Sequence, residues 1–272
     1  MISGMRESIQ FHRFPITGID PMTAASTRSY PRHIHDQYGV GVVDAGGHSS
    51  WSGRGQVEAG PRSFICVNPG EVHDGHAVGE QGRRWRMFYF DPGVIEQTRR
   101  DVLDGGCSEL TFRVPVFMDP ELQPLFEAAF SFGKATENDD GMAVETSLLR
   151  FVAGLVRHST SNVMLDAKTA DVRRARERID DDPTAPLSLA DLARDSGVSR
   201  YRFLRSFARE LGLTPHAYIL QRRLARARRL ILAGGALADV ASACGFCDQS
   251  HLNRCFVRQF GVTPRRYREK LS

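Results

Sequence analysis

The sequence contains 272 residues, of which 41% are hydrophobic, and carries a formal net charge of +4. That length suggests two domains, each with an apolar core of its own. No apolar run reaches membrane-spanning length and the polar N-terminal stretch has no signal-peptide core, so we expect a cytoplasmic protein without a membrane partner. The five scattered cysteines argue against a disulfide framework.

Charge is divided unevenly along the chain. Residues 170–272 hold 20 Lys and Arg against 11 Asp and Glu, whereas residues 1–169 hold 16 against 21. Basic side chains bind a phosphate backbone whatever its base sequence. The asymmetry therefore predicts a DNA-binding half joined to a half with another task.

The N-terminal region predicts an all-β unit. In residues 1–30, which are irregular, we expect an arm and one strand. Short apolar segments broken by glycine-rich turns follow at 39–43, 63–67 and 85–90. Short, evenly spaced strands are typical of a β-sandwich or barrel.

Three histidines are candidates for a ligand site. His33 and His35 form an H-x-H pair on one strand face, and His73 ends a P-G-x-x-H turn. Both motifs resemble those found in cupin barrels. Metal-binding cupins add a glutamate soon after the pair, but Gly39 and Val40 stand there. We therefore favour a ligand pocket or strand edge without metal or cofactor, although three imidazoles could still hold a metal ion.

The strand at residues 85–90 supplies a fourth candidate, Trp85. Alternation places Trp85, Met87 and Tyr89 on one face and Phe88 and Phe90 on the other. The pattern does not tell which face is interior, so Trp85 is equally a core residue or a ligand contact. An aromatic interior with a few polar groups would suit a small polar metabolite, such as an amino acid.

Apolar residues recur at helical spacing beyond the strands. Segments 94–103 and 119–159 are predicted helical, with a break between residues 136 and 141. These helices could cover the barrel, pair two chains, or do both. Residues 161–170 are small and polar and predict a linker between an N-terminal domain, 1–160, and a C-terminal domain, 171–272.

The C-terminal domain contains one helical pattern twice. LADLARDSGVSRYRFLRSF begins at residue 189, and LADVASACGFCDQSHLNRCF begins at residue 237. Gly197 and Gly245 occupy the same place in both copies, where a tight turn needs a left-handed residue. Each copy predicts a helix-turn-helix unit, at 188–211 and 237–260. Two ordinary helical hairpins are the weaker alternative, because the repeat coincides with the basic charge.

Capping signals define the helices of both units. Pro215 opens a connecting helix that we expect to end at the Gly234–Gly235 pair, after about 21 residues or roughly 31 Å. Successive major-groove faces of DNA are about 34 Å apart, so one chain could present both second helices to one duplex. The expected N-cap residues are Ser188, Ser199, Thr214 and Asp248.

The second unit also carries a family signature. It reads A-x-x-x-G-F from Ala241 and L-x-R-x-F-x-x-x-F-G-x-T-P-x-x-Y from Leu252 to Tyr267. Residues 171–270 resemble the DNA-binding domain of the AraC family of bacterial transcription regulators. The resemblance implies an α+β protein with a cupin-like β-barrel, helices after it, and an all-α domain of two helix-turn-helix units joined by a long helix. It also implies promoter DNA, a small-molecule effector, RNA polymerase and a second copy of the chain as partners.

Outward residues of the second helix in each unit should meet DNA. Arginine can read guanine, and Gln or Asn can read adenine, although phosphate contact is the usual role of a single arginine. By the resemblance, Arg205 stands where the family commonly has a base-reading arginine, and Arg254 matches it in the second unit. The candidates are Arg200, Tyr201, Arg202 and Arg205 in the first unit and Gln249, Ser250, His251, Asn253 and Arg254 in the second.

Two further groups of residues in this domain are candidates for a functional role. Arginines of the connecting helix are expected on a solvated or phosphate-facing surface. The C-x-x-C match Cys244–Cys247 lacks a second ligand pair, so Cys244 is expected to be a small buried residue. The connecting-helix arginines are Arg222, Arg223, Arg226, Arg228 and Arg229.

We therefore expect a sequence-specific transcription regulator that responds to an effector and is not an enzyme. The resemblance to the AraC family favours an activator over a repressor. Two alternatives stay open. One is a metal-dependent cupin enzyme that uses His33, His35 and His73, and the other is a DNA-binding regulator whose barrel only dimerises.

Overall fold

The computed structural model describes residues 7–52, 55–102, 110–132, 141–156 and 170–271. The chain forms two compact units, one mainly of residues up to 163 and one mainly of residues 164–270. The expected linker, 161–170, lies outside the described residues except for Ala170, and the expected break at 136–141 lies outside them except for Gly141. No described helix is long and apolar enough to cross a membrane.

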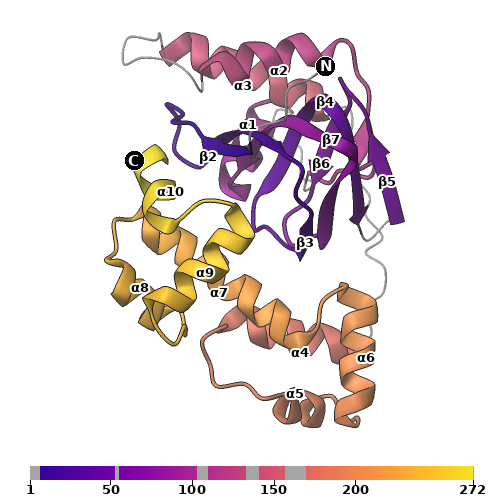
Figure 1. Ribbon diagram of the computed structural model, residues 1–272, viewed down its shortest axis with the longest axis vertical. Coiled ribbons are helices and arrows are strands. Elements are labelled where there is room, and N and C mark those ends of the chain that lie inside the picture. Colours follow the sequence, from indigo (N-terminus) through magenta and orange to yellow (C-terminus); the bar gives the residue numbers. More distant parts are fainter. Residues whose placement is uncertain (1–6, 53–54, 103–109, 133–140, 157–169, 272) are drawn as a thin grey trace. The chain divides into compact units, whose positions relative to one another are not determined.

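The N-terminal unit is built on an eight-stranded sheet in the order β1-β2-β7-β4-β6-β8, with β3 beside β7 and β5 beside β4 (Figure 1). The segments expected at 39–43, 63–67 and 85–90 are confirmed as parts of β4, β6 and β7. Residues 1–30 hold two full strands rather than one, because pairing with β7 makes a strand of the Pro- and Ala-containing β2 despite its weak propensity. The strands are β1 Ser8–Phe11, β2 Ile19–Ser26, β3 Tyr30–His33, β4 Tyr38–Ser52, β5 Gly55–Ala59, β6 Phe64–Val67, β7 His73–Phe90 and β8 Val116–Phe117.

A break in register bends the long β4–β7 pair. Gly46 lies opposite Arg83 but Gly47 lies opposite Val78, so residues 79–82 have no partner on β4. Gly46 has φ 76°, and a Cβ there would lie 2.1 Å from the carbonyl oxygen of Gly82, so only glycine fits. An irregularity of this kind bends a strand and increases its twist. Val78 and Arg83 therefore pair with neighbouring residues of β4, although four residues separate them along β7.

The helices after the sheet cover one of its faces. The ring of Phe88 lies 5.6 Å from that of Phe126, 5.2 Å from that of Phe130 and 5.9 Å from that of Phe151. Phe88 and Phe90 therefore face the helices, and Trp85, Met87 and Tyr89 face the other way. The expected helices appear as α1 Pro92–Val102, α2 Leu122–Ser131 and α3 Gly141–Val156, with α2 beside α3 (Figure 1).

The C-terminal unit is all helical, and its capping residues act as expected. The side chains of Ser188, Ser199, Thr214 and Asp248 each accept a backbone N–H of the first helical turn. The connecting helix is 18 residues, about 27 Å, and is shorter than expected because Ala233 already caps it. The helices are α4 Ala170–Asp181, α5 Leu189–Asp195, α6 Arg200–Leu211, α7 Pro215–Leu232, α8 Leu237–Ala243, α9 Gln249–Phe260 and α10 Pro264–Leu271.

Candidate nucleic-acid interface and candidate ligand site

The first helix-turn-helix consists of α5 and α6. Gly197 has φ 63° in the turn, as expected. Phe203 and Phe207 are buried with their ring centroids 5.6 Å apart. Burial of this face of α6 leaves its opposite face in solvent, as the 3.6-residue period requires. The four candidate DNA-contacting residues of this unit, Arg200, Tyr201, Arg202 and Arg205, are all exposed.

Tyr201 and Arg205 form a joint surface on α6. They are four residues apart, and the guanidinium carbon of Arg205 lies 5.7 Å from the centroid of the Tyr201 ring. Tyr201 is 69% exposed, although large aromatic side chains are usually buried. An exposed aromatic ring beside an arginine is suited to a partner that has both apolar and polar edges, such as a DNA groove.

The second helix-turn-helix consists of α8 and α9. Leu252 and Phe256 are buried, whereas Gln249, Ser250 and Arg254 are exposed. Asn253 and His251 are half-buried.

His251 differs from the other candidates because it also supports the turn. Its ring packs edge-on against Phe246 at 5.4 Å, and its Nδ1 accepts the Cys247 backbone N–H at 3.4 Å. Cys244 in the same turn is buried, as expected, and burial raises the pKa of its thiol. Packing and a hydrogen bond from neighbouring residues therefore help to fix this turn.

The arginines of α7 differ from expectation. Arg223 donates to two backbone carbonyls, that of Pro183 at 2.8 Å and that of Gly245 at 2.7 Å. Arg222 lies 2.9 Å from Asp180, and Arg228 is only 3% exposed. The expected solvated or phosphate-facing surface is therefore wrong for Arg228, which is buried, whereas Arg222 and Arg223 are half-buried and bonded to neighbouring elements. Arg229 is exposed and Arg226 is half-buried.

A buried tyrosine joins α4 to α7. The hydroxyl of Tyr218 donates to Asp180 at 2.8 Å and accepts from Arg176 at 3.2 Å. Burial raises the pKa of Tyr218 to about 12, with Asp180 adding to the effect and Arg176 and Arg222 opposing it. This group is not predictable from the sequence, because nothing in the local pattern links residue 180 to residue 218.

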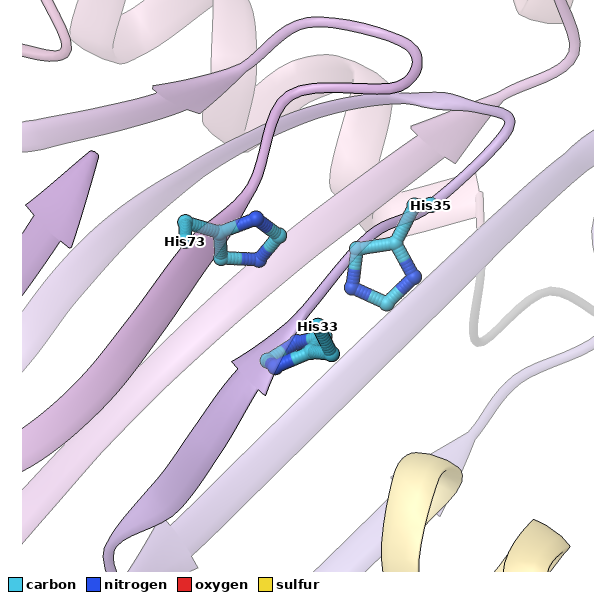
Figure 2. A group of neighbouring side chains, drawn as sticks. All are labelled: His33, His35 and His73. Carbon is cyan, nitrogen blue, oxygen red and sulfur yellow. The ribbon is translucent and has the colours of Figure 1, made fainter. Parts of the chain in front are cut away.

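The sheet unit brings the three candidate histidines together. His33 ends β3, His35 follows it and His73 begins β7, and Figure 2 shows their rings side by side. One nitrogen of each lies within 4.8 Å of one nitrogen of the others. The ring centroid of His35 lies 5.2 Å from that of His73 and 5.1 Å from that of Tyr89. The triad therefore lies on the face of β7 that carries Trp85 and Tyr89.

The protonation of His73 suits it for binding a ligand or metal. Its Nδ1 lies 3.1 Å from the carbonyl oxygen of Glu71 and must donate, because a carbonyl only accepts. Burial lowers the pKa of His73 to about 4, so the ring is neutral at pH 7. Its Nε2 then carries a lone pair, which can accept a hydrogen bond or coordinate a metal ion. Three such imidazoles fit the protein part of an open, four-coordinate site.

Trp85, the fourth candidate, lies beside residues that the sequence analysis did not single out. It is 7% exposed, its ring lies 6.3 Å from Tyr30 and 6.5 Å from His48, and the guanidinium carbon of Arg83 lies 4.7 Å from its ring centroid. Arg83 could have been found from the sequence, because it is two residues from Trp85 and so shares its face. Tyr30 and His48 come from β3 and β4, and their positions depend on strand pairing.

Comparison with protein families assigns both units. An AraC-like ligand-binding domain matches residues 21–152, and a helix-turn-helix domain matches residues 192–270. The uncharacterized HTH-type transcriptional regulator YbfI of Bacillus subtilis is 25% identical over 228 residues, 83% of this chain and 82% of that protein. The HTH-type transcriptional activator RhaS of Enterobacter sp. is 27% identical over 54% of each chain. GbdR of Pseudomonas aeruginosa is 38% identical over 31% of this chain and 23% of its own.

Solved structures with a similar fold include ToxT from Vibrio cholerae. Apo ToxT has a TM-score of 0.59 at 13% identity and covers 96% of this chain and all of that one. ToxT with a bound unsaturated fatty acid has a TM-score of 0.56 at 12% identity and covers all of this chain and 98% of that one. At such identities the likeness concerns the fold, and it confirms the expected α+β class.

Proposed function

Because this chain belongs to the AraC family, with a ligand-binding domain followed by a helix-turn-helix domain, we propose that it regulates transcription from specific promoters when a small molecule binds its N-terminal domain. The observation that carries the proposal is the pair of exposed helix faces on α6 and α9. Each face stands opposite a buried phenylalanine, Phe207 or Phe256, and is formed by the arginine, glutamine and asparagine side chains that read base edges.

In this proposal α6 and α9 enter successive major grooves of one duplex. Arg205 and Arg254 read guanine, Gln249 and Asn253 read adenine, and Tyr201 packs on a sugar or a thymine methyl group. Arg200, Arg202 and Ser250 hold the backbone, and His251 orients the second turn. The 18-residue α7, about 27 Å long, supports this arrangement because it approaches the roughly 34 Å between groove faces.

The effector is proposed to act through the N-terminal domain, 1–160, which a linker at 161–170 joins to the DNA-binding domain, 171–272. A ligand shifts activity only by binding one arrangement of the two domains better than another. His33, His35, His73 and Trp85 are proposed to line its site. We also propose a homodimer without catalytic activity that acts in the cytoplasm and recruits RNA polymerase. Activation is favoured because RhaS, a relative, is named an activator.

A metal-bound barrel is a second candidate, supported by the 4.8 Å spacing of the histidine nitrogens. Metal analysis of purified protein and of His35→Ala tests it: a bound metal should disappear with the substitution. If no metal is present and a metabolite panel produces no thermal shift, the barrel serves dimerisation alone.

DNA binding tests the main proposal. The full chain should be titrated with DNA from its own upstream region and with unrelated DNA across a salt series, alongside Arg205→Ala, Arg254→Ala and a control. Both variants should lose about 1–3 kcal/mol of discrimination between the two DNAs. Arg209→Ala is a matched control, because it removes an equal charge from the last turn of α6. It should weaken binding to both DNAs alike.

Two other outcomes would contradict parts of the proposal. If Arg205→Ala and Arg254→Ala weaken both DNAs equally, these arginines grip phosphate and do not specify sequence. If the wild-type chain binds no DNA at any salt concentration, with or without candidate effectors, the regulatory function is wrong.

A further inference from the structure

We propose that the N-terminal domain binds a carboxylate-bearing small molecule, whose carboxylate is held by Arg83 between Trp85 and Tyr30. This inference rests on the proposed function, because it names the chemical class of the effector. It concerns residues of β3, β4 and β7 outside the histidine triad.

Arg83 is a buried cation without a counter-ion. It is 1% exposed and is among the largest fully buried side chains of the protein. Its Nε and Nη1 have no hydrogen-bond partner, and no Asp or Glu in the described part of the chain forms an ion pair with it. Burial lowers the pKa of Arg83 only to about 10, so the guanidinium keeps its charge at neutral pH. A buried charge of this kind is normally paired, because its desolvation is costly.

Aromatic rings surround the guanidinium. Its central carbon lies 4.7 Å from the centroid of the Trp85 ring and 5.8 Å from that of the Tyr30 ring. Such cation–π contacts stabilise the faces of a guanidinium but leave its N–H groups unsatisfied. Those groups lie in the plane of the guanidinium and match a carboxylate, which can accept two of them at once.

Other unsatisfied polar atoms gather at the same place. In the portion of the chain that the structure describes, five buried side-chain polar atoms lack a hydrogen-bond partner, and three of them are Arg83 Nε, Arg83 Nη1 and His48 Nδ1. A fourth is the Tyr30 hydroxyl, which makes no hydrogen bond of normal geometry but lies close enough to Ser26 for that side chain to influence its pKa. Buried polar atoms are normally hydrogen-bonded, so several orphan atoms in one place call for a polar partner.

Gly75 makes room for the guanidinium. A Cβ at this position would lie 3.2 Å from Arg83 Nη2 and 3.3 Å from His48 Cε1. Val78 and Arg83 pair with the adjacent β4 residues Gly47 and Gly46, which brings Gly75 close to Arg83, so the backbone itself forms one wall of the cluster. Any side chain at position 75 would compete with the bound carboxylate for space.

The surroundings also favour one class of carboxylate. His48 is a titratable neighbour of Arg83 in this cluster. Burial, followed by the charge of Arg83, lowers the pKa of His48 to about 3, so the ring is neutral at pH 7. The carboxylate whose charge acts on Tyr30, that of Glu7, already accepts hydrogen bonds from the hydroxyls of Ser26 and Thr27. A carboxylate with an uncharged hydroxyl, keto or aromatic body therefore fits better than a zwitterionic amino acid, which is a change from the expectation based on sequence.

The test is a thermal-shift and fluorescence titration of the full chain with aliphatic, aromatic and hydroxy carboxylates, their amides, and phosphate monoesters. Trp51→Phe leaves Trp85 as the single tryptophan, because the chain has two. At least one carboxylate should raise the melting temperature and change Trp85 fluorescence, and its amide should bind at least about tenfold more weakly.

Two variants separate a binding role of Arg83 from a structural one. Arg83→Met should abolish the shift by the carboxylate while keeping or raising the melting temperature without ligand, because an unpaired buried charge is replaced by an apolar group. Gly75→Ala should weaken carboxylate binding at least about tenfold with Arg83 still present. A fall in ligand-free stability on Arg83→Met, with no carboxylate bound by the wild type, would show that Arg83 is purely structural.

Other results would overturn the inference in identifiable ways. If carboxylates and their amides bind equally well, the negative charge of the ligand plays no role. If only phosphate monoesters bind, the effector is a phosphate and not a carboxylate. If the wild type binds its upstream DNA but no carboxylate, this inference fails and the proposed function stands. If it binds a carboxylate through Arg83 but no DNA, the proposed function fails instead.

Discussion

Arg223 hydrogen bonds to Gly245 across the C-terminal unit, with 2.7 Å between its Nη1 and the glycine carbonyl oxygen. Its Nε donates to the carbonyl of Pro183 at 2.8 Å. Gly245 lies in the turn of the second helix-turn-helix, and Pro183 lies in the loop before α5 of the first. One guanidinium of α7 therefore connects the turn of the second helix-turn-helix to the loop that precedes the first.

Replacing Arg223 should loosen this connection. We expect Arg223→Met to cost roughly 1.5–3 kcal/mol of stability, because both carbonyls lose a charged donor. Affinity for a two-groove site should fall more than affinity for a single-groove half-site, since the two recognition helices are no longer held together. Hydrogen exchange of α8 amides and titration with both DNAs measure these effects. Arg229→Met, at an exposed position of the same helix, is the control and should leave α8 exchange unchanged.

The two turn glycines provide a matched pair. Both have positive φ, 63° at Gly197 and 73° at Gly245, so alanine at either costs about 1–2 kcal/mol for the left-handed backbone. A Cβ at Gly197 meets nothing within 4 Å, whereas one at Gly245 would lie 3.0 Å from Arg223 Cζ. Gly245→Ala should therefore lower the melting temperature more than Gly197→Ala. Equal losses would mean that Arg223 moves aside without cost.

The helix-turn-helix units were predictable because their signals are local. Caps such as Ser188, the turn glycines and the spacing of Phe203 and Phe207 all lie within one or two helical turns of what they specify. The contacts of Arg223 were not predictable, because they join residues 40 and 22 positions apart. The sequence pattern of α7 shows only that it is rich in arginine.

The candidate ligand site was predictable only in part. His33, His35, His73 and Trp85 were expected from motif and alternation, and the structure places them on one face of the sheet unit. Their assembly depends on β7 being a single strand from His73 to Phe90. The sequence does not predict this strand, because the glycines within it are typical of turns.

Arg86 should stabilise the N-terminal unit from the helix-facing side of β7. It donates to Asp44 on β4 at 2.7 Å and to Glu127 on α2 at 2.5 Å, and these carboxylates raise its pKa. Arg86→Met should cost about 1.5–3 kcal/mol, because two carboxylates lose a charged donor. Hydrogen exchange of β4 and β7 amides would report this loss for that unit alone.

Arg84 is the control for this substitution. It is exposed on the same strand, so Arg84→Met should change exchange little. If the β4 and β7 amides exchange equally fast in both variants, the ion pairs of Arg86 contribute no more to stability than an exposed arginine does.

Tyr218 should make the C-terminal unit sensitive to alkaline pH. Burial raises its pKa to about 12 from 10, so folding favours the neutral hydroxyl. The resulting stability is complete below about pH 10 and is lost as pH rises through about 12. A shift of one pKa unit corresponds to about 1.36 kcal/mol, so the loss of stability is on the order of 2–3 kcal/mol. Tyr218→Phe removes the titrating group together with its bonds to Asp180 and Arg176, so the advantage of the wild type should shrink over that range.

Urea midpoints of both proteins between pH 9 and 12 measure this advantage. Tyr201→Phe removes a hydroxyl from an exposed ring and should match the wild type throughout. An advantage of the wild type over Tyr218→Phe that stays constant to pH 12 would mean that the buried hydroxyl does not ionise before the unit unfolds. Its contribution would then come from its hydrogen bonds to α4 alone.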